Sequence, residues 1–374
     1  MKFDVSSTVL LNRLQSISRV IATKNTLPIL DSFLFRLEGE RLIIIASDME
    51  TRLETVAEVM NAEGSGVFAI SAKILLEPLK KLPEQPLTFD INDDNLEIFI
   101  YFMNGKYNFV GQNGDTYPQQ RSLSEDAMTI TMESQTLLNS ISRTLFATAD
   151  DELRPVMNGI YFDIQAEGIT FVASDGHKLV RLRNRTVKAE GRASFILPKK
   201  PAYLLKTLLT KSSDPVTVRF DENNACVKTE HFEMVCRLIE GRYPNYGSAI
   251  PEDNPNEVTI ERIPLTRVLE RVVVFSNQAS NLIKLQLMND LIVVSAQDID
   301  FSTSAEEKIV CQYGGTNFSI GFKATFLIEM LDNINAGEVV IKLADPSRAC
   351  VIVPVENAED EELLMLLMPM VLND

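Results

Sequence analysis

An internal repeat with a period near 125 residues constrains the fold of this chain more than any other feature of its sequence. Three apolar stretches align and lead into aspartates that are 127 and 123 residues apart, at Asp48, Asp175 and Asp298. A proline closes each copy at intervals of 126 and 125 residues, at Pro118, Pro244 and Pro369. Because two independent anchors give the same period, one structural unit is used three times. We therefore expect three domains, over residues 1–122, 123–253 and 254–374, with a linker at residues 252–256.

Each copy also divides into two similar halves, in which a strand and a helix precede three further strands. Apolar residues with a helical period mark the helices, which we expect at residues 6–24, 71–82, 133–149, 197–211, 264–276 and 322–333. Pro78 should kink or shorten the second of these helices. Six β-α-β-β-β halves predict about two dozen strands and an α+β fold, with helices on one side of antiparallel sheets.

Composition places the chain among globular proteins. Its 374 residues are 45% apolar and 24% charged, which is enough to bury several cores. The N-terminus carries Asp4 and lacks the pattern of a signal peptide, and the longest apolar run, residues 363–372, contains Pro369 and is too short to span a membrane. The four cysteines show no C-x-x-C spacing, so we interpret Cys226, Cys236, Cys311 and Cys350 as reduced core thiols of a cytoplasmic protein.

The charge of this acidic chain is unevenly distributed. The six expected helical segments carry a net charge of +9, whereas the whole chain carries −16, so the remaining residues carry −25. Ordinary scatter of solvated lysines is one explanation. The other is a helical surface that faces a polyanion, with phosphate contacts from Lys24, Lys80, Lys81, Lys199, Lys200, Lys206 and Lys211.

Helix packing indicates which closed assembly would surround a polyanion. Six helices spaced about 9 Å apart in a circle give a diameter of about 17 Å, and the helix bodies of about 10 Å leave too small a hole for a duplex. Twelve helices give a diameter of about 34 Å and a hole of about 24 Å. A dimeric ring is the smallest closed form that would admit a hydrated duplex.

The sequence gives no sign of catalytic chemistry. It contains no phosphate-loop, hydrolase-elbow or zinc-protease motif and only two histidines. Asp175 stands near His177, but Asp48 and Asp298 recur without a histidine, which favours a turn or capping role for the aspartates. We interpret His231 as a surface residue at a strand end, and we expect no catalytic residue, metal or cofactor.

Several motifs carry a resemblance to a known family. VASDGHKLVRL at residues 172–182, GRYPNY at 241–246, TLPIL at 26–30 and MPM at 368–370 resemble the bacterial DNA polymerase III β subunit, the sliding clamp. The resemblance covers the whole chain, including the threefold period. It implies three repeated DNA-clamp domains in a head-to-tail homodimer that encircles duplex DNA without regard to sequence, with helices lining the ring and sheets outside.

The resemblance also implies partners and a site for them. A clamp-loader ATPase would open the ring, the replicative polymerase α subunit would be tethered to it, and repair polymerases or ligase would use the same site through short peptide motifs. The residues carried over to this pocket are Met157, Ser174, Gly176, His177, Lys178, Leu179, Pro244, Ala249, Phe326, Leu366, Met368, Pro369 and Met370. Methionines with Leu and Phe suit an adaptable apolar pocket, with Met370, Leu179 and Phe326 as its wall and His177 and Lys178 at its rim. Core packing of a last strand is the alternative for Met368 and Met370.

The sequence departs from better-known family members at several positions. Gly247 and Ser248 stand where some members have an arginine, Phe326 replaces a frequent tyrosine, and Asn373 and Asp374 extend past the usual end. These changes affect the preferred peptide. On the DNA surface, Arg154 keeps a charge beside Pro155 and Val156, where some members have aromatic residues.

The expected dimer joins the first domain of one chain to the third domain of the other. The strand at residues 106–112 has Tyr107 and Phe109 on one face and is an edge strand that needs a partner. By resemblance it meets Val274 and Phe275, at the end of the helix of residues 264–275. These four could instead be ordinary core residues. A protein scaffold that never touches DNA and an enzyme with a dispersed site remain the competing functions.

Overall fold

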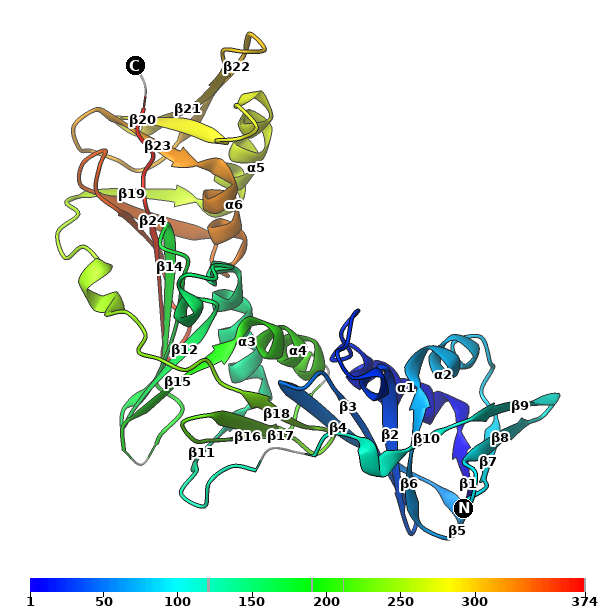
Figure 1. The fold of residues 1–374 in the computed structure, drawn as a ribbon. Coiled ribbons are helices and arrows are strands. Elements are labelled where there is room, and N and C mark those ends of the chain that lie inside the picture. Colours follow the sequence, from blue (N-terminus) through cyan, green and yellow to red (C-terminus); the bar gives the residue numbers. More distant parts are fainter. Residues whose placement is uncertain (120–121, 190, 211, 373–374) are drawn as a thin grey trace. The chain divides into compact units, whose positions relative to one another are not determined.

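The repeat predicted from the sequence is present in the strands and helices of the chain (Figure 1). The computed structural model describes residues 1–119, 122–189, 191–210 and 212–372. The first copy consists of β1 (Lys2–Ser6), α1 (Ser7–Ser18), β2 (Ser32–Glu38), β3 (Arg41–Ser47) and β4 (Thr51–Glu58), then β5 (Met60–Glu63), β6 (Gly66–Ser71), α2 (Ala72–Leu79), β7 (Pro86–Ile91), β8 (Glu97–Phe102), β9 (Gly105–Val110) and β10 (Gln112–Asn113).

The other two copies repeat this order without the two short extra strands. The second consists of β11 (Met128–Glu133), α3 (Ser134–Thr144), β12 (Gly159–Gln165), β13 (Gly168–Ser174), β14 (Lys178–Asn184), β15 (Ala193–Pro198), α4 (Lys199–Leu209), β16 (Pro215–Phe220), β17 (Asn224–Lys228) and β18 (Glu233–Arg237). The third consists of β19 (Asn256–Glu261), α5 (Arg262–Val272), β20 (Leu282–Met288), β21 (Leu291–Asp298), β22 (Thr303–Val310), β23 (Phe318–Lys323), α6 (Ala324–Asp332), β24 (Glu338–Leu343), β25 (Cys350–Pro354) and β26 (Glu361–Leu367). The β-α-β-β-β halves are confirmed.

The helices are shorter than the sequence pattern predicted. α1 ends at Ser18, and α2 ends at Leu79, directly after Pro78, as expected from the missing amide of proline. Single 3₁₀ turns at Leu145–Ala147 and Val273–Phe275 occupy the ends of the segments expected for α3 and α5. Apolar periodicity does not distinguish these tighter turns from α-helix, because both bury the same side of the chain.

The strands form antiparallel sheets in two compact units. Residues 1–135 and 207–238 form unit 1, and residues 136–206 and 239–374 form unit 2. Unit 1 contains a five-stranded sheet, β5-β1-β7-β8-β9, and a nine-stranded sheet, β10-β6-β2-β3-β4-β18-β17-β16-β11. Unit 2 contains an eight-stranded sheet, β15-β12-β13-β14-β26-β25-β24-β19, and a four-stranded sheet, β22-β21-β20-β23. The expected central domain contributes to both units, and its boundaries stay a prediction.

The two largest sheets each join consecutive copies of the repeat. β4 pairs with β18 in unit 1, and β14 pairs with β26 in unit 2. We call these two strand pairs joints. In each joint, the last strand in the first half of one copy pairs with the last strand of the next copy. Two consecutive repeats are therefore held together by backbone hydrogen bonds across a continuous sheet.

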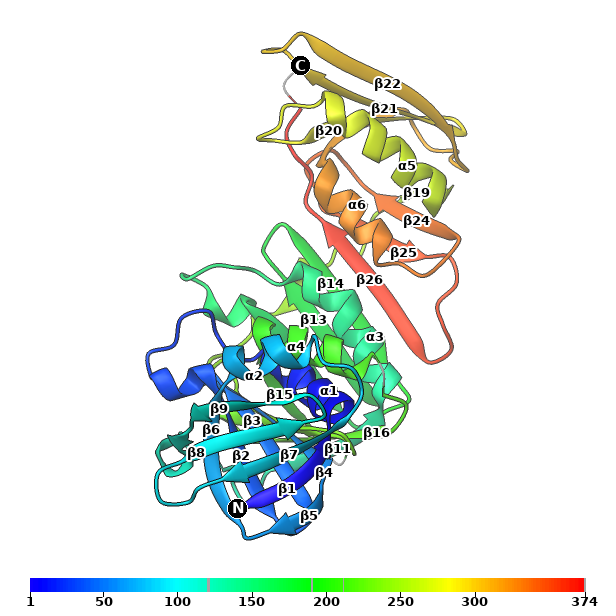
Figure 2. The same ribbon diagram turned by 90° about the vertical axis from the view of Figure 1, so that its right-hand side faces the viewer.

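The helices bury one apolar face and leave the other face exposed. α1 buries Leu10, Leu14 and Ile17, which recur at helical spacing. In unit 2, α5 and α6 lie side by side (Figure 2). Among the described residues, no helix is both long enough and apolar enough to cross a membrane.

Candidate functional site

The three repeated aspartates occupy the same kind of tight turn at the end of a strand. The Asp175 Oδ1 atom accepts hydrogen bonds from the amides of His177 and Lys178, at 2.8 and 2.9 Å. Asp48 accepts from the amides two and three residues further along, and Asp298 does the same. The turn role predicted from the repeat is confirmed. In the second copy, this turn presents His177 at the surface and leads into β14.

An apolar cluster lies beneath that turn, at the joint between β14 and β26. Leu179 faces Leu366 across the two strands, and each is only 4% exposed. Val172, Ile196, Tyr243 and Ala349 belong to the same cluster of buried residues. The Leu179 side chain is therefore packed within the protein core, and its part in a partner pocket stays a prediction.

Lys178 lies in the interior, although the sequence placed it at an exposed rim. It is 5% exposed, and its Nζ donates to the Glu329 Oε2 atom at 2.6 Å. The same Nζ lies 4.3 Å from the centre of the Phe326 ring. A buried ammonium needs such a carboxylate and ring face. Lys178 therefore does not lie at an exposed rim, whereas His177 is exposed and its place at the rim stays a prediction.

The C-terminal segment after β26 is held by two backbone hydrogen bonds. The Met368 amide donates to the carbonyl of His177, and the Met370 amide donates to the carbonyl of Gly321, both at 2.8 Å. Met368 is exposed, while Pro369 and Met370 are half-buried. Two expected pocket residues of this segment, Met368 and Met370, are thus tied to the turn before β14 and to β23, which leads into α6 and Phe326. Asn373 and Asp374 lie outside the described residues.

The segment between the second and third copies adds exposed residues to unit 2. Pro244 and Ala249 are exposed on either side of Tyr246. The Tyr246 hydroxyl donates to the Asp163 carboxylate at 2.8 Å, and the Tyr243 ring stacks on Tyr161 with the ring centres 4.7 Å apart. Burial raises the pKa of both Tyr243 and Tyr246, so both phenols are neutral at physiological pH. Gly247 and Ser248 lie within a 3₁₀ turn, Tyr246–Ala249.

The remaining expected pocket residues lie near the same turn. Met157 and Ser174 are buried, and Ser174 accepts from the Gly176 amide and donates to the Lys178 carbonyl. Gly176 has a φ of +89°, where a side chain would be strained, and a Cβ there would lie 2.8 Å from an Arg154 guanidinium nitrogen. Arg154 forms a salt bridge with Asp151, so an ion pair lies beside Gly176 in this turn.

Sequence reasoning missed two charged residues that flank Phe326. Lys323 places its Nζ 4.5 Å from the centre of the Phe326 ring, and Glu329 binds Lys178. Both could have been found from helical spacing, since they stand three residues before and three residues after Phe326. The Phe326 ring thus contacts two ammonium groups, those of Lys178 and Lys323, and Glu329 pairs with the first of them.

The residues expected to bind DNA are basic, but several lie outside the helices. Lys199, Lys200 and Lys206 are on α4, whereas Lys80 and Lys81 follow the end of α2. Lys24 lies in the loop after α1, and Arg154 precedes a 3₁₀ turn. The expectation of helical positions was wrong for Lys24, Lys80 and Lys81, because α1 and α2 end earlier than their apolar periodicity suggested. Lys211 lies outside the described residues.

The residues expected at the dimer contact lie on an edge strand of the first copy and in a turn after α5 of the third copy. Tyr107 and Phe109 are half-buried on β9, the outer strand of its sheet, opposite Ile100 and Ile98 of β8. They share the core-facing side of the sheet with these two residues, and Tyr107 packs on Phe102. Val274 and Phe275 are exposed in the 3₁₀ turn after α5. Core packing thus accounts for part of the surface of Tyr107 and Phe109 and leaves the rest open.

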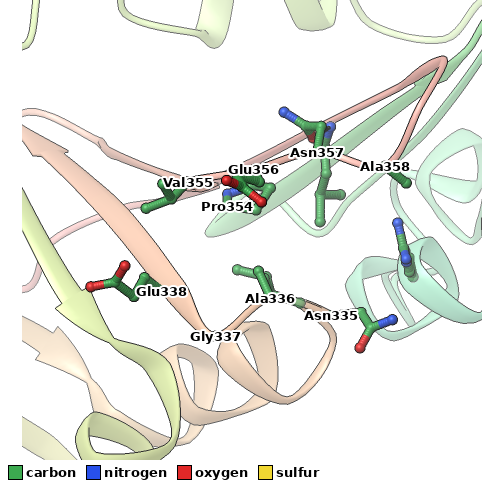
Figure 3. Close-up of a pocket in the computed structure, with 12 residues that line it drawn as sticks. Asn335, Ala336, Gly337, Glu338, Pro354, Val355, Glu356, Asn357 and Ala358 are labelled. Carbon is green, nitrogen blue, oxygen red and sulfur yellow. Dashed lines mark hydrogen bonds between the residues drawn. The ribbon is translucent and has the colours of Figure 1, made fainter.

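A separate cavity of about 450 Å³ lies at the other end of α6. Figure 3 shows Asn335 of the α6–β24 connection and Glu338 at the start of β24, together with Glu356 and Asn357 of the β25–β26 connection. Arg143 of α3 lines it and is bonded to Glu361 at 2.8 Å. Phe326 is in the first turn of α6, so this cavity is distinct from the candidate partner pocket.

Solved structures share this architecture over the full chain. A sliding clamp (DNA polymerase III subunit beta) from Pseudomonas aeruginosa, bound to griselimycin, has a TM-score of 0.94 at 24% identity and covers 100% of both chains. The DNA polymerase III beta subunit from Thermotoga maritima has a TM-score of 0.90 at 24% identity, with the same coverage. These likenesses show that the three-domain clamp fold expected from the sequence is correct.

Sequence comparisons extend the likeness to the family level. A beta sliding clamp from Pseudomonas aeruginosa is 26% identical over 99% of this chain and 100% of its own length, and one from Streptococcus pneumoniae is 24% identical over 98% of each. Models of the N-terminal, central and C-terminal domains of the DNA polymerase III beta subunit match residues 1–121, 131–245 and 247–371. The chain therefore belongs to the DNA polymerase III beta subunit family, the bacterial sliding clamps.

Proposed function

We propose that two copies of this chain close head to tail into a ring around duplex DNA and hold partner proteins through the pocket at the β14–β26 joint. The main support for this proposal is the strand pairing that recurs between consecutive copies of the repeat. β4 pairs with β18 and β14 pairs with β26, so the first two copies each use the last strand of their first half to bind the following copy. The third copy has the corresponding strand, β22, at the edge of its sheet.

The strand that would complete the pattern is β9, the counterpart in the first copy of β18 and β26. It too lies at the edge of its sheet. Val110 on β9 and Val310 on β22 are both exposed, as are Val274 and Phe275 beside α5. Open strand edges with exposed apolar residues need a partner in solution. If β22 of one chain pairs with β9 of another, the backbone hydrogen-bonding groups at both sheet edges gain partners. Two such pairings between two chains close a ring.

Phosphate contacts come from the basic residues on and after the helices. Lys200 and Lys206 are exposed on α4, and Lys24 and Lys81 are exposed in the connections. Lys80 is bonded to Glu77, and Lys199 is bonded to Asp150, so phosphates would compete with those two carboxylates. Lysine binds phosphate as a point charge, and phosphate contacts carry no sequence information. We therefore expect DNA contacts that are independent of sequence and exchange readily.

The partner pocket supplies the tethering function. Leu179 and Leu366 belong to one apolar cluster, and with Met370 and Phe326 they would accept the apolar anchor of a short peptide. The replicative polymerase α subunit, the clamp loader and repair polymerases or ligase would share this site. A clamp acts through such binding and performs no reaction of its own.

Retention on circular DNA tests encirclement. The clamp is loaded on nicked circular DNA by its cognate loader, washed at moderate salt, and the DNA is then cut once. We expect the clamp to remain on the circle and to leave the linear product, because a ring is held by topology whereas charge contacts weaken with salt. Equal retention on both forms would exclude encirclement and would favour direct binding to the DNA surface. Failure to associate with either form would favour a protein scaffold.

A further inference from the structure

The first copy of the repeat contains a small cavity at the position that the candidate partner pocket has in the second copy. It has a volume of about 100 Å³ and lies entirely in unit 1. Its lining includes Ser47, Met49, Glu50, Arg52, Pro118 and Val235. The proposed partner pocket lies in unit 2, so these are separate sites.

The correspondence between the two places can be followed bond by bond. Ser47 donates to the Thr51 carbonyl at 3.1 Å, as Ser174 does to Lys178 at 2.8 Å. Asp48 accepts the Thr51 amide as Asp175 accepts the Lys178 amide. Pro118 is the counterpart of Pro244 in the closing motif. The cavity is therefore part of the repeat and is built on the same turn and strand.

The strand register identifies the one residue that changes the chemistry. Arg52 stands four residues after Asp48, as Leu179 stands four residues after Asp175. Arg52 faces Val235 across β4 and β18, just as Leu179 faces Leu366 across β14 and β26. An apolar floor in the second copy is thus replaced by a guanidinium in the first.

The guanidinium of Arg52 is buried without full compensation. The side chain is 11% exposed, and its Nε is a buried donor with no hydrogen-bond acceptor. The nearest carboxylate oxygen, on Glu54, is 3.7 Å from Nη2, which is longer than a direct hydrogen bond. Burial lowers the pKa of Arg52, and Glu54 opposes that change. A buried cation with an open donor favours an anionic ligand.

The backbone beside the cavity is also unusual. Met49 has a φ of +82° in the position where the second copy has Gly176. A side chain in this left-handed conformation is strained, and such strained residues often lie at binding sites. The methionine side chain is exposed at the cavity, where it would contact whatever enters.

We infer that this cavity binds a carboxylate group, the acidic side chain of a protein partner, through the Arg52 guanidinium. A space of about 100 Å³ holds a carboxylate and its adjoining methylenes but not a complete peptide anchor. Planar two-point contact with a carboxylate is the interaction for which arginine is suited. Glu50 also lines the cavity, so affinity for an isolated group should be weak, on the order of 1 mM.

Methionine methyl NMR on the full-length clamp tests this inference. Chains labelled at the methionine methyls report on this cavity through Met49 and on the partner pocket through Met368 and Met370, with Met49→Leu giving the assignment. The probe is N-acetylglutamate N-methylamide, and the matched control ligand is its glutamine analogue. We expect a saturable shift of the Met49 signal with the acid, little shift with the amide, and unchanged Met368 and Met370 signals.

Variants at Arg52 separate a real site from general ionic effects. Arg52→Leu copies the second repeat and should weaken binding of the acid at least tenfold, while Arg52→Lys should retain part of it. If Arg52→Leu fails to fold, Arg52→Gln removes the charge with a polar side chain and serves the same purpose. A response to the amide equal to that of the acid, an undiminished response in the neutral variant, or no response would each overturn the inference.

A further arm separates the two sources of a carboxylate. Sodium acetate represents a free small anion, and a tripeptide with a central glutamate, blocked at both ends, represents a protein partner. Tighter binding of the peptide than of acetate supports a protein ligand. Acetate binding as tight as that of the peptide would show a small-anion site and would overturn the assignment of a protein partner.

Discussion

Leu179 lies directly opposite Leu366 where β14 and β26 join the second and third copies of the repeat. The pair is a structural contact between repeats, and both residues belong to the expected partner site. A peptide anchor that reaches it would therefore touch side chains whose positions are fixed by the core. Such rigidity reduces the ordering cost of binding a short flexible segment.

The double variant Leu179→Ala with Met370→Ala should weaken partner-peptide binding more than tenfold. Removing two apolar side chains from an anchor site costs at least about 2 kcal/mol of binding free energy. Titration of a fluorescent peptide from the C-terminus of the cognate polymerase measures the change. Val371→Ala is the matched control, since Val371 is exposed beside Met370 and should leave the affinity unaltered.

Thermal unfolding must accompany that titration, because Leu179→Ala also removes a buried side chain and should itself lower stability by about 2–5 kcal/mol. Phe326→Ala, at a half-buried residue, provides a second variant with less effect on folding. If the folded double variant bound the peptide with an affinity within about twofold of that of the wild type, the pocket assignment would be wrong.

Truncation of Tyr107 and Phe109 to Ala together should yield a folded monomer. Both side chains lie near the open edge of β9, and their loss removes apolar surface from the proposed contact. Sedimentation velocity gives the oligomeric state, and circular dichroism shows whether the chain is folded. Tyr101→Ala is the control, because Tyr101 is on neighbouring β8 opposite Lys106 and so points to the other face of the sheet. A dimer that persists, or an unfolded chain, would count against the interface.

Glu329→Gln should destabilise the protein by about 1 kcal/mol, and Glu270→Gln should change stability by less than about 0.5 kcal/mol. The two carboxylates have equal side-chain exposure, 41%, but Glu329 binds the buried Lys178, and Glu270 binds the exposed Arg267. Without the Glu329 carboxylate, the buried Lys178 ammonium keeps only the more distant Asp175 carboxylate, at 3.7 Å, as an ion-pair partner. Chemical denaturation of both variants measures the difference, and equal effects would show that the burial of Lys178 does not matter.

The cysteines should make the protein less stable as the pH rises above 9. Burial raises the pKa of Cys236 and Cys350 to about 12 and that of Cys226 and Cys311 to about 11, from 9.0. Above pH 9 the thiols of the unfolded chain ionise while the folded ones stay protonated, so unfolding is favoured. Below pH 9 both states are protonated and this contribution to stability is fully present.

Denaturation of the wild type and of a Cys236→Ser/Cys350→Ser variant, compared between pH 8 and 10, isolates the thiols. The wild type should lose more stability over this range than the variant. Slow alkylation of the native chain by iodoacetamide and fast alkylation after unfolding would agree with this, since the thiolate is the reactive form. Rapid alkylation of all four thiols in the native chain at pH 8 would contradict it.

The sequence by itself determined the period, the order of elements and the fold class. Asp48, Asp175 and Asp298 mark the same turn because only local hydrogen bonds are needed to form it, and the apolar spacing in α1 shows its buried face directly. The family also follows from sequence, since its motifs are contiguous. Helix ends were less predictable, as 3₁₀ turns and loops after α1, α3 and α5 continue the apolar pattern.

Tertiary structure alone decided which charged side chains are buried. Lys178 reads as a rim residue in sequence, but the β14–β26 joint and α6 enclose it beside Glu329 and Phe326. Arg52 was assigned no role from the sequence, and only its pairing with Val235, far along the chain, shows that it stands where the second copy has Leu179. The burial of these side chains and the groups they contact depend on strands that are distant in sequence and meet only when the sheet forms. Local sequence patterns therefore do not predict either property.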